Sequence, residues 1–277
     1  MSTLFAGEES YVYDASNIKD IMGDGREIYA GGDRRLFSRL PPPKDAQPPM
    51  NSTPFEDAFE IIPRSKWDEM IDAQIANGGR VSDYQNFAPY DQNGLPTCWA
   101  NGVMAAAATK RVQMGYAYKQ ISSCSVAVPI SGGHSGGWET DALNYLIKYG
   151  GVSTDLWPNN STDRSLMKDP KCQADRKNFM ALEYLTLNSR FETYATAALL
   201  GIPVAVAYND WSHVVMGCDL VRISAGKYGY RIRNNWGNWG SKNAYGHAGY
   251  AVFAEGAYSH GCPDSGVGIR QMTAYAG

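Results

Sequence analysis

Three short segments of the sequence carry side chains that could together perform nucleophilic catalysis. Cys98 follows a turn containing Gly94 and Pro96 and precedes an alanine-rich stretch that is typical of a helix. A cysteine at the start of a helix meets the positive end of the helix dipole, which stabilises its thiolate form. His213 and Asn234 lie further along the chain, where one opens a predicted strand and the other ends the next strand. These two side chains can therefore face each other across a sheet.

Each of these residue types supplies one part of an acyl-transfer reaction. A neutral thiol is a poor nucleophile, so we expect His213 to hold the proton of Cys98 as an imidazolium in a ready-made ion pair. The side-chain oxygen of Asn234 would accept a hydrogen bond from the other ring nitrogen and fix the orientation of the ring. Gln92, in the turn upstream, and the backbone N–H of Cys98 would stabilise the developing oxyanion. That turn would leave the sulfur of Cys98 exposed.

The positioning of these residues requires helices early in the chain and strands late in it. Apolar residues recur at helical spacing in three segments, the first of them capped by Ser65. Short segments rich in Val, Ile and Tyr indicate strands in the last third of the chain. The expected helices are 65–76, 98–115 and 139–149, and the expected strands are 203–208, 213–221, 228–233 and 249–254. Helices followed by strands predict an α+β protein with two lobes.

The motifs around these residues resemble those of the papain-like cysteine peptidases, the family of papain and the cathepsins. That family has a Gln, a glycine-containing turn and Cys-Trp-Ala at the start of its central helix, followed by a His and an Asn-x-Trp-Gly motif. The matching residues stand here in the same order: Gln92, Cys98-Trp99-Ala100, His213 and Asn234-Asn235-Trp236-Gly237. Further likenesses are Gly136-Gly137-Trp138, Gly201-Ile202-Pro203-Val204-Ala205-Val206 and Gly249-Tyr250. The resemblance covers about residues 61–275.

The resemblance implies a papain-like two-lobe fold, with Cys98 in a helical left lobe and with His213 and Asn234 in an antiparallel, β-rich right lobe. It also implies that Trp236 covers the hydrogen bond between His213 and Asn234 from water. The sequence departs from the family at Leu95, which stands where the family has a cysteine of its structural disulfide. The stretch before the histidine is also short, so one wall of the cleft would be truncated.

The glycine-rich strip of the resemblance implies a site for the substrate backbone. By this likeness Gly136, Gly137 and Trp138 would bind an extended polypeptide. Glu139 follows directly, and two interpretations of it stay open. In the first, Glu139 lies in the pocket for the substrate side chain that precedes the scissile residue, where it would favour a basic group. In the second, it is an ordinary carboxylate at the start of a helix.

Composition and charge exclude several classes of protein. The net charge is −3 and the pI about 5.8, which gives no general electrostatic attraction to nucleic acid or anionic lipid. No run reaches the roughly 18–20 apolar residues of a membrane span, and the first ten residues lack a secretory signal. Five cysteines without an export signal predict thiols in a reducing compartment, namely the cytoplasm or, for a virus-encoded chain, the virion. We expect no cofactor and no metal, because His247, His260 and Cys262 match no common zinc spacing.

Two parts of the chain differ in composition. Residues 61–277 are typical of a compact domain, here the peptidase domain. Residues 1–60 form an arm with a short strand at 11–13 and a stiff proline-rich linker at 41–49. The arm could be a pro-segment, a tether that docks on a protein partner, or a poorly ordered tail.

The sequence as a whole predicts a cysteine endopeptidase that hydrolyses polypeptides through a covalent acyl-enzyme on Cys98, with His213 as its proton-transfer partner. The alternative from another class is a structural or docking protein, such as a viral particle component, that retains the fold and binds a partner through its arm. The same residues could also catalyse another acyl transfer, such as amide hydrolysis of non-protein substrates or transpeptidation. A fold does not by itself decide among these functions.

Overall fold

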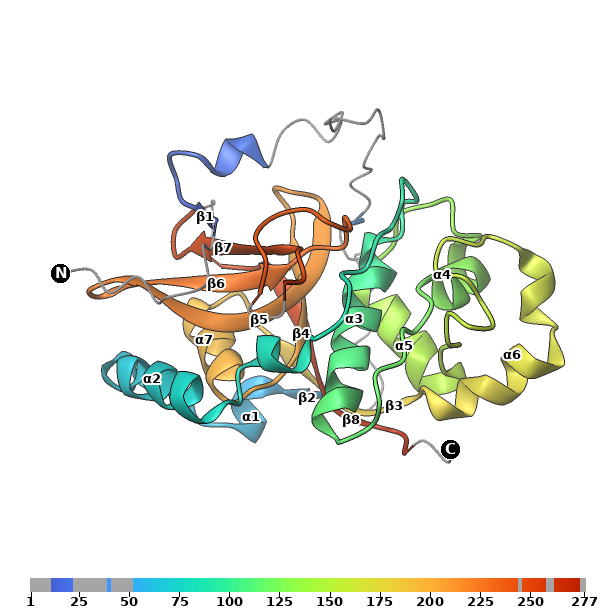
Figure 1. Cartoon of the computed structure of the whole chain (residues 1–277), viewed down its shortest axis with the longest axis horizontal. Coiled ribbons are helices and arrows are strands. Elements are labelled where there is room, and N and C mark those ends of the chain that lie inside the picture. Colours follow the sequence, from blue (N-terminus) through green and yellow to red (C-terminus); the bar gives the residue numbers. More distant parts are fainter. Residues whose placement is uncertain (1–10, 22–38, 41–51, 244–245, 258–261, 275–277) are drawn as a thin grey trace.

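The computed structural model describes residues 11–21, 39–40, 52–243, 246–257 and 262–274. The helices are α1 (Phe55–Ala58), α2 (Trp67–Asn77), α3 (Cys98–Gln113), α4 (Cys124–Ser131), α5 (Glu139–Tyr149), α6 (Pro170–Asp175) and α7 (Phe191–Leu199), and 3₁₀ turns cover Ile18–Asp20, Arg64–Lys66, Val81–Tyr84, Arg164–Met167 and Arg176–Asn178. Figure 1 shows two lobes side by side: α3, α4, α5 and α6 make up a helical lobe, while α2 and α7 flank a sheet in the other. The proline-rich linker predicted at 41–49 lies outside the described residues.

One twisted sheet forms the second lobe. The strands are β1 (Val12–Tyr13), β2 (Ser52–Pro54), β3 (Ala181–Leu187), β4 (Val204–Tyr208), β5 (His213–Ser224), β6 (Lys227–Arg233), β7 (Tyr250–Ala254) and β8 (Ser265–Met272). Within the described residues they lie in the order β1-β7-β6-β5-β4-β8-β3-β2. The inner pairs are antiparallel, whereas the two outermost strands, β1 and β2, pair in parallel with β7 and β3. The predicted α+β class is confirmed.

The elements that carry the candidate site begin where the sequence predicts them. α3 starts at Cys98, α5 spans the predicted residues 139–149, and β5 starts at His213. The sequence patterns missed the helices α1, α4, α6 and α7 and the strands β2, β3 and β8. α4 has Pro129 in its interior, and proline argues against a helix. Two glycines in β8 weaken its strand pattern in the same way.

The helix cap predicted at Ser65 is wrong. Ser65 lies inside the 3₁₀ turn Arg64–Lys66, and α2 begins after it at Trp67 with no side-chain capping bond. Pro63 is extended, with φ −66° and ψ 146°, and the chain turns directly after it. Lys66 holds the N-cap position of α2, so the serine stands one residue too early to meet the unpaired N–H groups of that helix.

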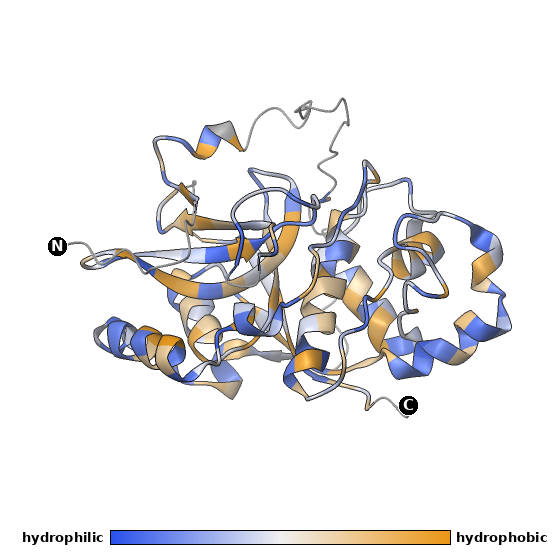
Figure 2. Cartoon of the chain, in the orientation of Figure 1, coloured by the Kyte–Doolittle hydropathy of each residue, from blue (hydrophilic) through white to orange (hydrophobic). Residues whose placement is uncertain are grey.

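α3 is the central helix, and a glycine lets it lie directly against the sheet. Nearly all its residues are buried, including its alanines. A Cβ on Gly102 would lie 2.8 Å from Cγ1 of Val214 and 3.2 Å from the carbonyl oxygen of Val215. This close approach places the start of α3 beside the start of β5. Figure 2 shows the contrast with the outer α6, which is mostly hydrophilic, whereas α7 on the sheet is mostly hydrophobic.

The described parts of the first 60 residues pack on the rest of the chain. β1 (Val12–Tyr13) lies within the strand predicted at 11–13, which is one residue longer, and it pairs with β7 through Val12 and Val252. Ile21 is buried in the same core as the sheet, and so is Phe55, which follows β2. The arm thus supplies both edge strands of the sheet. The domain boundary at residue 60 stays a prediction.

All five cysteines lie in described parts of the chain and are thiols rather than disulfides, as the sequence predicts. No helix in the described ranges is long and apolar enough to cross a membrane.

Candidate active site

Cys98 is the first residue of α3, and the preceding turn is held by backbone bonds. The N–H of Gln92 donates to the carbonyl of Asn235 at 2.9 Å, and the N–H of Leu95 donates back to the carbonyl of Gln92 at 2.9 Å. The side-chain Nε2 of Gln92 donates to the carbonyl of Leu95 at 2.8 Å. Asn93 and Gly94 both have positive φ, 45° and 75°. These bonds therefore hold the segment before Cys98 against the loop after β6.

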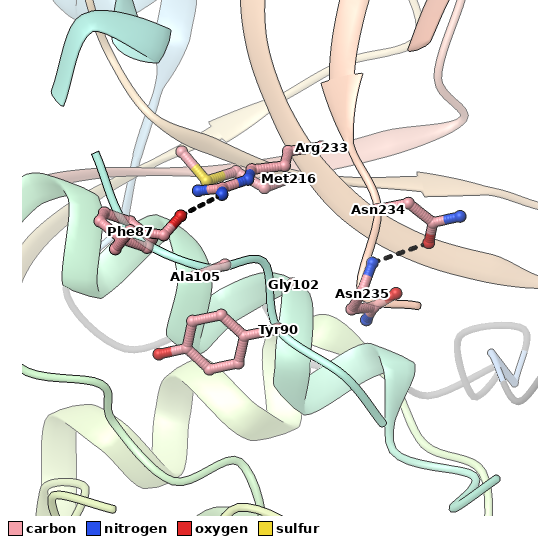
Figure 3. Close-up of a pocket in the computed structure, with 8 residues that line it drawn as sticks. All are labelled: Phe87, Tyr90, Gly102, Ala105, Met216, Arg233, Asn234 and Asn235. Atoms are coloured by element: carbon pink, nitrogen blue, oxygen red, sulfur yellow. Dashed lines mark hydrogen bonds between the residues drawn. The ribbon is translucent and has the colours of Figure 1, made fainter. Parts of the chain in front are cut away.

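The imidazole of His213 is oriented by the loop after β6. Its Nε2 lies 2.9 Å from Oδ1 of Asn234. The backbone N–H of Asn235 donates to the same Oδ1 at 2.8 Å (Figure 3). A carboxamide oxygen only accepts hydrogen bonds, so Nε2 carries a hydrogen. In the neutral ring the lone pair then lies on Nδ1, which is the arrangement a general base needs.

Asn235 joins the two halves of the site. Its Nδ2 lies 3.3 Å from the carbonyl oxygen of Cys98 and 3.3 Å from that of Val214. One side chain thus links the start of α3 to the residue after His213 on β5. The sequence marked Asn235 only as a member of its motif. Its linking role depends on tertiary packing and left no sequence signal.

Two tryptophans enclose the imidazole. The ring centroid of Trp236 lies 4.9 Å from that of His213 at an angle of 31°, and Trp211 packs edge-on at 4.6 Å and 70°. The two indoles contact each other at 5.5 Å. The resemblance to the papain-like peptidases implied the contact of Trp236 but not that of Trp211. Trp211 stands two residues before the histidine, a position that could have drawn attention to it.

The site is closed to solvent, which corrects two predictions. Gln92, Cys98 and His213 are each 0% exposed, so the sulfur is buried where the turn was expected to expose it. Burial lowers the pKa of His213 from 6.5 to about 3, and the hydrogen bond to Asn234 opposes this shift only in part. This shift favours the neutral imidazole over the imidazolium expected from the sequence, because burial removes the water that would solvate the charged ring.

The glycine strip lies beside α3, the helix that begins at Cys98. A Cβ on Gly137 would lie 2.4 Å from the indole of Trp99, so only glycine fits at this position. Gly136 is half-buried, and Trp138 precedes α5 and donates from Nε1 to Glu139 at 3.0 Å. The backbone of Arg39 pairs with that of Gly137 in an isolated parallel β-bridge. The sequence did not single out Arg39, which lies far from the other site residues along the chain.

A small cavity lies behind the two asparagines (Figure 3). It is lined by Phe87, Tyr90, Gly102, Ala105, Met216, Arg233, Asn234 and Asn235. The guanidinium of Arg233 lies between the rings of Phe87 and Tyr250, 4.9 and 5.0 Å from their centroids. The cavity shares Asn234 and Asn235 with the site, but Cys98 and His213 are not among its lining residues. In the described ranges no three His, Cys, Asp or Glu side chains are grouped as a metal would require.

Comparisons with known proteins identify the fold. No protein-family model matches the chain, and no curated protein matches it significantly. Among solved structures, xylellain, a cysteine protease from Xylella fastidiosa, matches with a TM-score of 0.56 and 19% identity, over 86% of this chain and 97% of that one. A procathepsin B from Trypanosoma congolense matches with a TM-score of 0.56 and 16% identity, over 92% and 96%. The bromelain protease from Ananas comosus, solved with the E64 inhibitor, matches with a TM-score of 0.54 and 18% identity, over 71% and 98%. The chain has a papain-like fold, as its motifs imply.

Proposed function

We propose that this chain is a cysteine endopeptidase in which Cys98 is the nucleophile and His213 transfers protons. The observation that carries the proposal is the hydrogen bond from His213 Nε2 to Asn234, because it leaves Nδ1 as the basic nitrogen. Asn235 holds the nucleophile helix and the histidine strand together. The papain-like fold shared with cysteine proteases supports the same reading.

The reaction proceeds through a thioester. His213 takes the thiol proton as Cys98 attacks the peptide carbonyl, and the oxyanion is held by the Cys98 N–H and by the side-chain amide of Gln92. His213 then gives its proton to the leaving amine. Water adds to the thioester with His213 as base, and the thiol and a carboxylic acid are released. We place the enzyme in a reducing compartment such as the cytoplasm, where five thiols persist.

Peptide hydrolysis by the full chain tests this function. We would measure cleavage of casein and of a mixed fluorogenic peptide library by the wild type, Cys98→Ala and His213→Ala. Either substitution is expected to lower turnover by at least about 10³-fold. Cys218→Ala is the matched control, since this thiol is also 0% exposed but lies on β5 away from the turn. Turnover that survives Cys98→Ala would contradict the proposal. So would a wild type that cleaves no peptide although its Cys98 reacts readily with an alkylating reagent in a separate sample.

A further inference from the structure

A buried ion pair lies at the edge of the candidate site. Nε of Arg39 lies 3.3 Å from Oε2 of Glu139, and the NH2 atom of Arg39 lies 3.4 Å from Oε1. The guanidinium therefore donates a hydrogen bond to each carboxylate oxygen. The same NH2 donates to Oγ of Ser265 at 3.0 Å, and that hydroxyl donates to Glu139. The side chains of Arg39 and Glu139 are 2% and 1% exposed. The three residues come from the arm, the start of α5 and the start of β8.

The backbone at Arg39 spans the two lobes like a bound peptide. Its N–H donates to the carbonyl of Ser212 at 2.9 Å, and the N–H of Leu40 donates to the carbonyl of Gly137 at 3.0 Å. Arg39 and Gly137 are paired in parallel register. Ser212 directly precedes His213, so the backbone of residues 39–40 links the glycine strip to the start of β5. Backbone hydrogen bonds of this kind hold extended peptides irrespective of sequence, while a side-chain pocket adds the selectivity.

The chemistry of Glu139 defines what such a pocket accepts. A carboxylate removed from water requires an opposite charge as well as hydrogen bonds. Trp138 and Ser265 supply neutral donors, and Arg39 supplies the positive charge. An arginine pairs with both carboxylate oxygens through its planar fork, whereas a lysine offers only a point charge and an aliphatic side chain offers neither.

We propose that Glu139 and Ser265 form a pocket selective for an arginine side chain of a polypeptide substrate, and that Arg39 occupies it as an internal competitor. The inference rests on the proposed peptidase function and names the substrate class of that same site. A substrate must displace Arg39 before its own backbone can bind along Gly137. The buried state of Cys98 and His213 is then the state in which the chain's own arginine fills the pocket.

A second buried ion pair shows what a purely structural pair looks like. Arg231 on β6 lies 3.1 Å from Asp219 on the neighbouring β5, with side chains 7% and 2% exposed. It joins two adjacent strands of the sheet, β5 and β6. Arg231→Ala is therefore the control for the general effect of breaking a buried pair.

The experiment uses the full chain and reads Cys98 labelling by peptide mapping, so it requires no turnover. We would compare the wild type, Arg39→Ala, Arg39→Lys, Arg231→Ala and the double variant Arg39→Ala with Glu139→Gln. The first probe is iodoacetamide. The second is a pair of dipeptidyl chloromethyl ketones that differ only in whether arginine or norleucine precedes the terminal residue. Near-ultraviolet circular dichroism checks that each variant is folded.

Arg39→Ala is expected to raise the rate of iodoacetamide labelling of Cys98 at least tenfold. The rate for Arg39→Lys should lie between those of Arg39→Ala and the wild type. Arg231→Ala should label at the rate of the wild type. In Arg39→Ala the arginine probe should label at least tenfold faster than the norleucine probe. Adding Glu139→Gln to Arg39→Ala should abolish this preference, so that the two probes label Cys98 at equal rates. Equal rates for the two probes in Arg39→Ala, or unchanged iodoacetamide labelling in both Arg39 variants, would overturn the proposal.

The two proposals fail in different ways. Arginine-selective labelling without hydrolysis of any peptide would contradict the peptidase function and leave the pocket standing. Hydrolysis by Arg39→Ala with no preference for arginine would contradict the pocket alone.

Discussion

The burial of His213 predicts a measurable loss of stability in mild acid. The perturbation is a change of pH from 7 to 5, over which an exposed histidine takes up a proton. His213 is fully buried, and its pKa is lowered from 6.5 to about 3. The folded chain therefore does not bind this proton, whereas the unfolded chain does. Because the folded pKa is the lower one, the free energy of unfolding falls as the pH drops from about 6.5 toward about 3.

The magnitude follows from the two pKa values. A single proton bound only by the unfolded chain lowers the free energy of unfolding by about 1.4 kcal/mol per pH unit below the unfolded pKa. Between pH 7 and pH 5 the loss from His213 is about 2 kcal/mol, since the first half unit lies above that pKa. For a chain of this length this corresponds to a fall of about 3–4 °C in Tm.

Urea unfolding at pH 7, 6 and 5 is the assay, followed by far-ultraviolet circular dichroism. The wild type is compared with His213→Gln, which cannot take up the proton, and with His134→Gln, which replaces an exposed histidine. Other titrating groups contribute equally to all three proteins, so the difference in slope isolates His213. The wild type and His134→Gln should lose about 2 kcal/mol more than His213→Gln.

Equal slopes for the wild type and His213→Gln would refute the reasoning, because they would mean that His213 titrates alike in the folded and unfolded chains. Nuclear magnetic resonance of the imidazole gives an independent check. A His213 ring signal that shifts with a midpoint near 6.5 in the folded protein would refute it as well.

Three further substitutions test the packing around the site. Gly137→Ala places a Cβ against the indole of Trp99 and is expected to lower the free energy of unfolding by about 1–3 kcal/mol in urea; an unchanged midpoint would show that the strip moves freely away from α3. Gly102→Ala places a Cβ 2.8 Å from Val214 and should destabilise the chain by a similar amount, about 1–3 kcal/mol, and a variant as stable as the wild type would contradict the close approach of α3 and β5. Asn235→Leu leaves two backbone carbonyls without their shared donor and should cost about 1–3 kcal/mol in thermal or urea unfolding; no loss would mean that these carbonyls find other partners.

Local sequence patterns predicted the elements that carry the candidate site, because the helix and strand signals of these elements come from residues that are neighbours in the sequence. The start of α3 at Cys98 follows from the turn before it and the alanines after it. The strands β4 to β7 follow from their β-branched and aromatic residues. Elements with contrary local patterns were missed: α4 contains a proline, and β8 contains glycines that pack against Tyr194 and Ile202. Their stability comes from neighbours that are distant in the sequence.

The sequence by itself determined which residues could do chemistry and in what order they stand, since Cys98, His213, Asn234 and Gln92 are recognisable from type and spacing. Only the tertiary structure decided their state. It buries the thiol and the imidazole, keeps the imidazole neutral, and brings Arg39 to Glu139 across a separation of 100 residues. The physical reason is that charge and hydrogen-bonding capacity belong to a side chain, whereas exclusion of water depends on everything that packs around it.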